Sequence, residues 1–192
     1  MKIIELIINE LEDIMGVEAM SVVEHPAIES NFLALNKQVS VELKTVDEEK
    51  RILLGAALIP NKPIYRNDDI NGEYYIFFSK KTVRQASELF LKGGKQNNAT
   101  EEHERDIDGM TVVESWLKED DVNDKSVKYG IEAPIGTWFI SMKVYNDDIW
   151  EKVKLGKIKG FSIEAYFADK YETPQEQGVE DKLSEIIKIL EG

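Results

Sequence analysis

The sequence contains no cysteine and only two histidines among its 192 residues. The first absence excludes disulfide bonds, thiol catalysis and thiolate metal sites, and it fits a reducing compartment. With so few nitrogen and sulfur ligands, a zinc site is not expected, and we predict neither a metal nor a cofactor. Basic residues are also scarce, because 24 Lys and Arg against 37 Asp and Glu give a net charge of −13. Sequence-independent binding of nucleic acid needs clustered Lys and Arg, so we expect no nucleic-acid partner.

Long apolar runs are missing as well. No stretch approaches the ~20 residues that a membrane-spanning helix needs. Acidic residues interrupt the N-terminal apolar stretch where a signal peptide would continue, so we expect a soluble protein with no membrane association. Hydrophobic residues still make up 42% of the chain, which is enough for a packed core.

Length and patterning predict one main domain followed by a short tail. We place the domain, with an N-terminal arm, at residues 1–172. A polar linker and an amphipathic helix then occupy residues 173–192. One stripe of that helix is apolar and consists of Leu183, Ile186, Ile187 and Leu190.

The elements within the domain are mostly extended. Three apolar stretches read as strands: 51–59, 74–78 and 137–145. Asn71-Gly72 precedes the second of them and is well suited to a tight hairpin turn. Two helices are expected, one over 82–92 with Thr82 and Gln85 at capping-box spacing, and one over 147–155 capped by Asn146. The pattern predicts an α+β fold, mainly an antiparallel, barrel-like sheet surrounded by a few helices.

One further strand, residues 157–167, carries the first candidate functional residue. Ser162, Glu164 and Tyr166 alternate with apolar residues, so these three share one face. The apolar neighbours predict a central strand that holds Ser162 in place. The alternative is an ordinary half-buried strand whose serine faces water.

His103 is the better of the two histidine candidates for catalysis, since nothing near His25 suggests a role. Asp108-Gly109 is a two-residue hairpin signal, and a turn there would place His103 directly opposite Glu114. A carboxylate in that position could hold the imidazole in one tautomer and stabilise its protonated form. A slip of one residue would destroy this register. Glu164 is the competing acid, because it shares a strand face with Ser162.

Two other site types receive less support. His103 with its neighbouring glutamates could bind a metal weakly and act in a metal-dependent hydrolase. The acidic run 119–124 lacks the regular spacing of a calcium loop and is expected to be a solvated loop.

Several blocks of the sequence, taken in order over about residues 20–168, resemble the phage prohead (capsid maturation) serine proteases, in particular those of Gram-positive phages and prophages. These blocks are Ser21 to Ile28, Gly55 to Arg66, Glu102-His103, Val113 to Trp116, Gly136 to Trp138, Met142 to Val144 and Gly160 to Glu164. Ala165 departs from the pattern, because glycine is expected there in most relatives.

The resemblance implies a fold like the herpesvirus assemblin protease and a catalytic pair of Ser162 as nucleophile and His103 as general base. Glu114, the third member on the hairpin register, is not dictated by the family pattern, and Glu164 stays open. The implied function is a serine endopeptidase that cleaves scaffold and major capsid proteins, and itself, inside the assembling procapsid in the host cytoplasm. A homo-oligomer is also expected. The alternative is a non-catalytic scaffolding component that keeps the protease fold.

Overall fold

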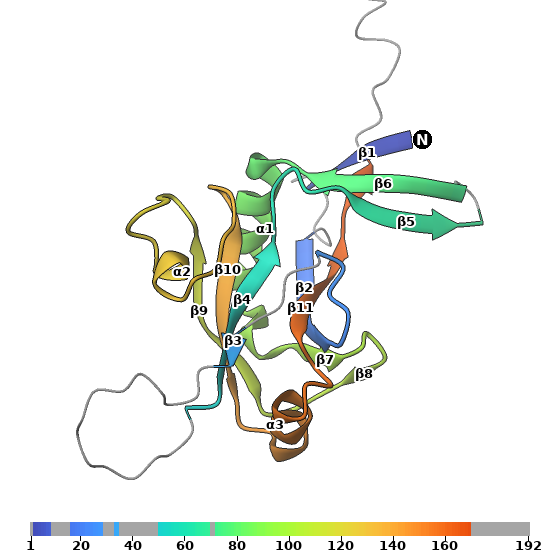
Figure 1. Cartoon of the computed structure of the whole chain (residues 1–192). Coiled ribbons are helices and arrows are strands. Elements are labelled where there is room, and N and C mark those ends of the chain that lie inside the picture. The colour runs from blue at the N-terminus through green and yellow to red at the C-terminus, as the bar shows by residue number, and fades with distance from the viewer. Residues whose placement is uncertain (1, 9–15, 29–32, 35–49, 70–71, 170–192) are drawn as a thin grey trace, which may run out of the picture.

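The computed structural model describes residues 2–8, 16–28, 33–34, 50–69 and 72–169 (Figure 1). The strands in this part of the chain are β1 (Lys2–Ile7), β2 (Gly16–Val23), β3 (Leu33–Ala34), β4 (Ile52–Leu58), β5 (Ile64–Asp68), β6 (Gly72–Phe78), β7 (Ala99–Glu101), β8 (Arg105–Asp106), β9 (Met110–Leu117), β10 (Trp138–Val144), β11 (Gly160–Tyr166) and β12 (Ala168–Asp169). The helices are α1 (Lys80–Lys92), the 3-10 helix η1 (Lys95–Asn97), α2 (Lys125–Lys128) and α3 (Asp147–Lys154).

The strands form three four-stranded sheets with the orders β12-β1-β6-β5, β3-β4-β10-β9 and β11-β2-β7-β8. Most neighbours are antiparallel, while β1 with β6 and β2 with β7 pair in parallel. The α+β prediction is therefore confirmed. The strand orders of the described residues are open, so the barrel-like closure predicted from the sequence is not found there. In Figure 1 the β5–β6 hairpin projects to one side of the body formed by the other two sheets.

The core is built around β10, a central strand of its sheet. Trp138, Phe139, Ile140 and Met142 are completely buried. The strand is buried on both faces because α1 packs on one side, where Phe90 meets Trp138 at a ring-centroid distance of 5.6 Å. On the neighbouring strand, Trp116 stacks on Phe139 at 5.3 Å. Each such side chain contributes ~1.5–3 kcal/mol through burial.

Local sequence signals place most elements correctly. The hairpin expected at Gly72 is present, since Asp68 pairs with Gly72 across β5 and β6 and Gly72 has a φ of 65°. Helix α3 begins after Asn146, whose side chain accepts a hydrogen bond from the Ile149 N–H at 3.0 Å. Helix α1 starts earlier than predicted, because Ser79 rather than Thr82 is its N-cap. The predicted helix in 173–192 lies outside the described residues.

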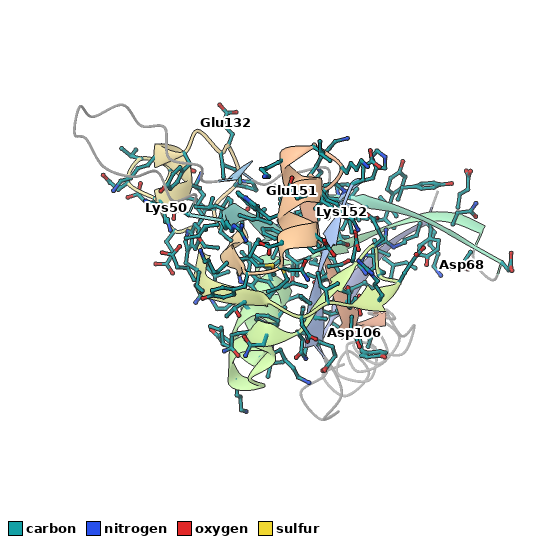
Figure 2. The ribbon with its side chains drawn as sticks, turned by 90° about the horizontal axis from the view of Figure 1, so that it is seen from below. Lys50, Asp68, Asp106, Glu132, Glu151 and Lys152 are labelled. Carbon is teal, nitrogen blue, oxygen red and sulfur yellow. The ribbon has the colours of Figure 1, made fainter. Side chains whose placement is uncertain are left out.

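Charged side chains extend from several different elements of the structure. Figure 2 labels examples on different elements, with Asp68 at the outer end of the β5–β6 hairpin and Glu151 and Lys152 on α3. Within the described ranges, no helix is both long and apolar enough to cross a membrane.

Candidate active site

His103 lies in the turn between β7 and β8, not opposite Glu114. These two strands pair with each other, Thr100 with Asp106 and Glu101 with Arg105. Strand β9 pairs instead with β10. Gly109 does form a turn, with a φ of 77°, but the strands that it joins belong to different sheets. The predicted hairpin register is therefore wrong, and with it the geometric reason for pairing His103 with Glu114.

The turn that carries His103 has an unusual backbone. Glu102 and His103 have φ values of 53° and 60°, and the Glu104 N–H donates to the Glu101 carbonyl at 3.0 Å. Positive φ at both central residues is the signature of a type I′ turn, which normally takes Asn and Gly. A non-glycine residue in this region costs about 1–2 kcal/mol. Strain of this kind persists only where surrounding contacts impose it, and it gathers at functional sites.

The contacts that impose it come from β2 and from Glu24, the residue that follows it. The Glu102 N–H donates to the Val22 carbonyl at 3.2 Å, and the Glu102 carboxylate accepts from the Glu24 N–H at 2.7 Å. The His103 N–H donates to the Ser21 hydroxyl at 3.1 Å. Ser21, which accepts this hydrogen bond, is completely buried. The turn is thus held at both of its strained residues.

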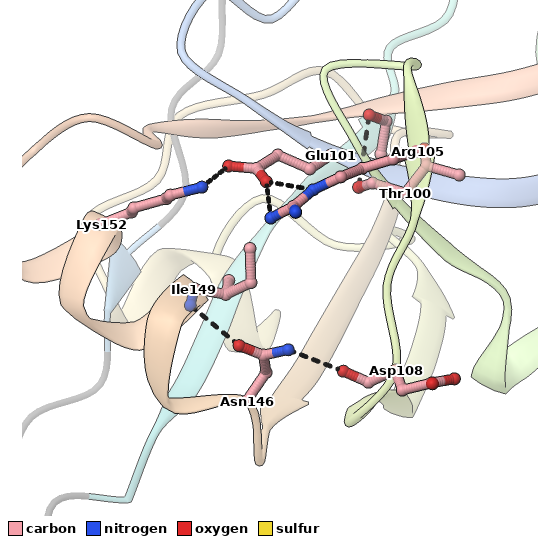
Figure 3. Close-up of polar contacts among 8 residues, drawn as sticks. Thr100, Glu101, Arg105, Asp108, Asn146, Ile149 and Lys152 are labelled. Carbon is pink, nitrogen blue, oxygen red and sulfur yellow. Dashed lines mark hydrogen bonds and ion pairs between the residues drawn. The ribbon is translucent and has the colours of Figure 1, made fainter.

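The other side of the β7–β8 hairpin is anchored to α3 (Figure 3). The Glu101 carboxylate accepts a hydrogen bond from Lys152 of α3. It also accepts hydrogen bonds from two nitrogens of the Arg105 guanidinium, Nε and Nη2. Burial acts to raise the pKa of Glu101, but the hydrogen bonds from Lys152 and Arg105 outweigh it and leave this pKa below its ordinary value. Figure 3 also shows Asn146 donating from its side-chain amide to the Asp108 carbonyl, 3.1 Å away.

Ser162 lies on β11, the outermost strand of its sheet among the described strands. The prediction of a central strand is therefore wrong, although the strand itself is confirmed. Ser162 pairs directly with Ser21 of β2, and Ser21 pairs with Thr100 of β7. Partners in a ladder point to the same face, so these three hydroxyl residues form a row across the sheet. Ser162 is half-buried at one end of that row.

Glu164 brings the row and the histidine together. Its Oε1 atom lies 3.4 Å from His103 Nδ1 and accepts a hydrogen bond from the Thr100 hydroxyl. A register shift separates Glu164 from Ala165, and such bulges re-aim neighbouring side chains. A carboxylate beside Nδ1 favours the tautomer that carries the proton there and leaves Nε2 able to accept one. In the described part of the chain, no hydrogen bond joins the Ser162 hydroxyl to the His103 ring.

Glu114 belongs to a different neighbourhood. Its carboxylate pairs with Lys125 of α2, and this ammonium holds the pKa of Glu114 below its ordinary value. Both residues line a groove of about 640 Å³ over β9, together with Trp116 and apolar neighbours. Ser162, His103 and Glu164 do not line this groove.

The described residues hold no group of three or more His, Asp or Glu side chains placed to bind a metal. The second histidine, His25, is exposed over 86% of its side chain and has Glu24 beside it at 3.9 Å.

Sequence reasoning missed Ser21 and Thr100. Ser21 opens the block that resembles the prohead proteases, but its neighbours give no sign that it contacts a turn far along the chain. Thr100 had no local signal, because its position beside Ser21 depends on the parallel pairing of β2 with β7.

Comparison with known proteins agrees with the serine protease assignment at the level of the family. A family model described as "Putative phage serine protease XkdF" matches residues 38–172, a range that contains His103, Ser162 and Glu164. The chain is 26% identical over 141 residues to the phage-like element PBSX protein XkdF of Bacillus subtilis (strain 168). This alignment covers 72% of the chain and 45% of that relative, so the chain spans less than half of the relative's length. No solved structure gave a significant match, so the assemblin-like fold stays a prediction. Because the family model spans well over half of the chain, the protein belongs to the phage XkdF family that this description names.

Proposed function

We propose that the protein is a serine endopeptidase that cleaves scaffold and major capsid proteins, and itself, during maturation of the phage procapsid. The observation that carries the proposal is the contact of Glu164 with His103 Nδ1 at 3.4 Å, on the sheet face that also bears Ser162. Membership of the phage XkdF family supports the same reaction class.

In this proposal Ser162 is the nucleophile, His103 the general base and Glu164 the residue that orients the imidazole. The Ser162 hydroxyl attacks the scissile carbonyl carbon while its proton passes to His103 Nε2. The same proton then goes to the leaving amine as the peptide C–N bond breaks and an acyl-enzyme forms. Water, deprotonated by His103, hydrolyses the ester and restores the serine.

The mechanism requires the His103 ring to come within hydrogen-bond reach of Ser162. Its side chain is 42% exposed, so it has room to rotate about the fixed turn. Catalytic hydrogen bonds are often long before substrate binds. We propose that this alignment is completed in the assembling capsid, where the substrate and other copies of the chain are concentrated.

Co-expression with the phage scaffold protein tests the proposal. We expect scaffold fragments, identified by mass spectrometry, with the wild-type chain and none with Ser162→Ala. Equal cleavage by both would move the nucleophile to another residue.

The alternative is a non-catalytic assembly component, which is favoured by the lack of a Ser162–His103 hydrogen bond among the described residues. It predicts intact scaffold together with normal capsid formation. A metal-dependent hydrolase would instead lose its activity on addition of a chelator, and Ser162→Ala would leave it active.

A further inference from the structure

The sheet β12-β1-β6-β5 has one face in the core and one face outside it. The core face includes Ile4, Ile64, Ile76 and Phe78, all of them buried. The side chains that alternate with these point the other way. They form what we call the outer face, whose polar members are Glu5, Asn67 and Glu73 and whose apolar members are Ile3, Ile7, Tyr65, Tyr75 and Phe77.

Five side chains of the outer face are apolar although they lie outside the core, and the Tyr65 hydroxyl donates a hydrogen bond to Glu73 on the same face at 3.0 Å. Ile3 is 64% exposed and Tyr65 is 47% exposed. Ile3 pairs with Tyr75 across β1 and β6, and Tyr75 pairs with Tyr65 across β6 and β5. The two tyrosine rings meet edge to face at 5.8 Å, so the three side chains form a continuous strip across three strands. None of these five apolar residues packs against the hydrophobic core. Contiguous exposed apolar surface of this kind usually marks a docking site.

The chain itself supplies a matching segment. Strand β12 pairs with β1, with Ile7 opposite Ala168, so the chain leaves the described structure at the edge of this same sheet. The tail then repeats apolar residues at helical spacing: Leu183, Ile186, Ile187 and Leu190. Its other positions are mainly charged, as expected for a helix with one face covered.

The reach of the linker is sufficient. Residues 170–179 can span about 33 Å when extended, at about 3.3 Å per residue. Four strands at ~4.8 Å spacing make a sheet only about 15 Å wide. An amphipathic helix that follows this linker can therefore lie across every strand of the sheet.

We propose that residues 180–190 dock as an amphipathic helix on the outer face of the sheet β12-β1-β6-β5. Leu183, Ile186, Ile187 and Leu190 cover the strip formed by Ile3, Tyr75 and Tyr65. This contact covers the face of the sheet that points away from the core, and the β5–β6 hairpin of this sheet projects at the side of the body in Figure 1. The inference is independent of the proposed protease activity.

Cross-linking tests the contact directly, because the chain has no cysteine of its own. In the full chain, Ile3→Cys combined with Ile187→Cys should form an intramolecular disulfide under mild oxidation, measured by mass spectrometry and gel mobility. The matched control combines Ile3→Cys with Lys188→Cys, which lies on the charged side of the predicted helix and should cross-link several-fold less. Equal yields from the two pairs would overturn the proposal. A disulfide-linked dimer as the main product would also do so, because a second copy would then be the occupant.

A second variant checks the contact without new cysteines. Ile186→Asp in the full chain should shift the methyl NMR signals of Ile3 and Ile7 and leave that of Ile140 unchanged, since Ile140 is buried in another sheet. Unchanged signals from Ile3 and Ile7 would contradict the docking.

Discussion

Nδ1 of His103 lies 3.4 Å from Oε1 of Glu164, and the same carboxylate oxygen accepts the Thr100 hydroxyl. The first residue comes from a strained turn and the second from the strand that bears Ser162. Of the two carboxylates that sequence reasoning left open, Glu164 lies beside the imidazole and Glu114 pairs with Lys125.

Glu164→Gln should reduce proteolysis far more than Glu114→Gln. Loss of the carboxylate beside Nδ1 removes the group that selects the imidazole tautomer, and we expect a decrease on the order of 10²–10⁴-fold. Glu114 pairs with Lys125 instead, so its amide variant should retain activity within a few-fold. The measurement is labelling of Ser162 by a fluorophosphonate probe in cells that co-express the scaffold and major capsid proteins, where the proposed alignment of Ser162 with His103 is completed. A larger loss with Glu114→Gln would mean that Glu114, as predicted from the hairpin register, is the third catalytic residue.

His103→Gly should stabilise the fold and abolish activity. The φ of 60° at His103 suits glycine. Relief of this strain should outweigh the loss of side-chain contacts, so we expect the free energy of unfolding to rise by about 1 kcal/mol. The transition midpoint in urea should rise while fluorophosphonate labelling disappears. His25→Gly is the control, because the backbone of His25 is not left-handed and no gain is expected there. A lower midpoint for His103→Gly would mean that the turn is not strained.

Lys152→Met should destabilise the protein by ~1–3 kcal/mol at neutral pH, the usual range for a hydrogen bond to a charged group. Lys152 and Arg105 hold the pKa of Glu101 in the folded protein below its ordinary value. Their stabilisation is therefore fully present above the pKa that Glu101 has in the unfolded chain, and it is lost as the pH falls through the pKa of Glu101 in the folded protein. Urea melts from pH 7 down to about pH 3 should show the difference from wild type shrinking.

Lys154→Met is the matched control for this pair. Lys154 lies on the same helix and pairs with Glu151, whose side chain is 62% exposed, so the cost should be below about 1 kcal/mol at every pH. Equal losses for the two lysines would contradict the anchoring role of Glu101.

Asn146 should prove to have two separable functions. Its side-chain oxygen Oδ1 caps α3 by accepting a hydrogen bond from the Ile149 N–H. Its side-chain nitrogen Nδ2 donates a hydrogen bond to the Asp108 carbonyl. Asn146→Asp keeps the cap and loses the second bond, whereas Asn146→Ala loses both. We expect Asn146→Ala to cost about 1–2 kcal/mol and Asn146→Asp less, measured by urea unfolding. Equal losses would show that the cap contributes nothing.

The sequence alone determined the elements whose signals are local. Strand β10 follows from alternating apolar residues, and α3 follows from the Asn146 cap and the acidic first turn, because these patterns depend on neighbours within a few residues. The placement of Ser162 and Glu164 on the same face of β11 was predicted for the same reason.

Only the tertiary structure decided which strands become neighbours. The Asp108-Gly109 signal correctly marks a turn, but a turn does not require its flanking strands to pair, and β9 pairs with the buried strand β10 instead. His103 reaches Glu164 because β7 joins β2 in parallel and β2 joins β11. Those pairings are set by burial of the whole core rather than by local propensity, so the sequence supplied Ser162 and His103 as candidates while the sheet order brought Ser21, Thr100 and Glu164 to them.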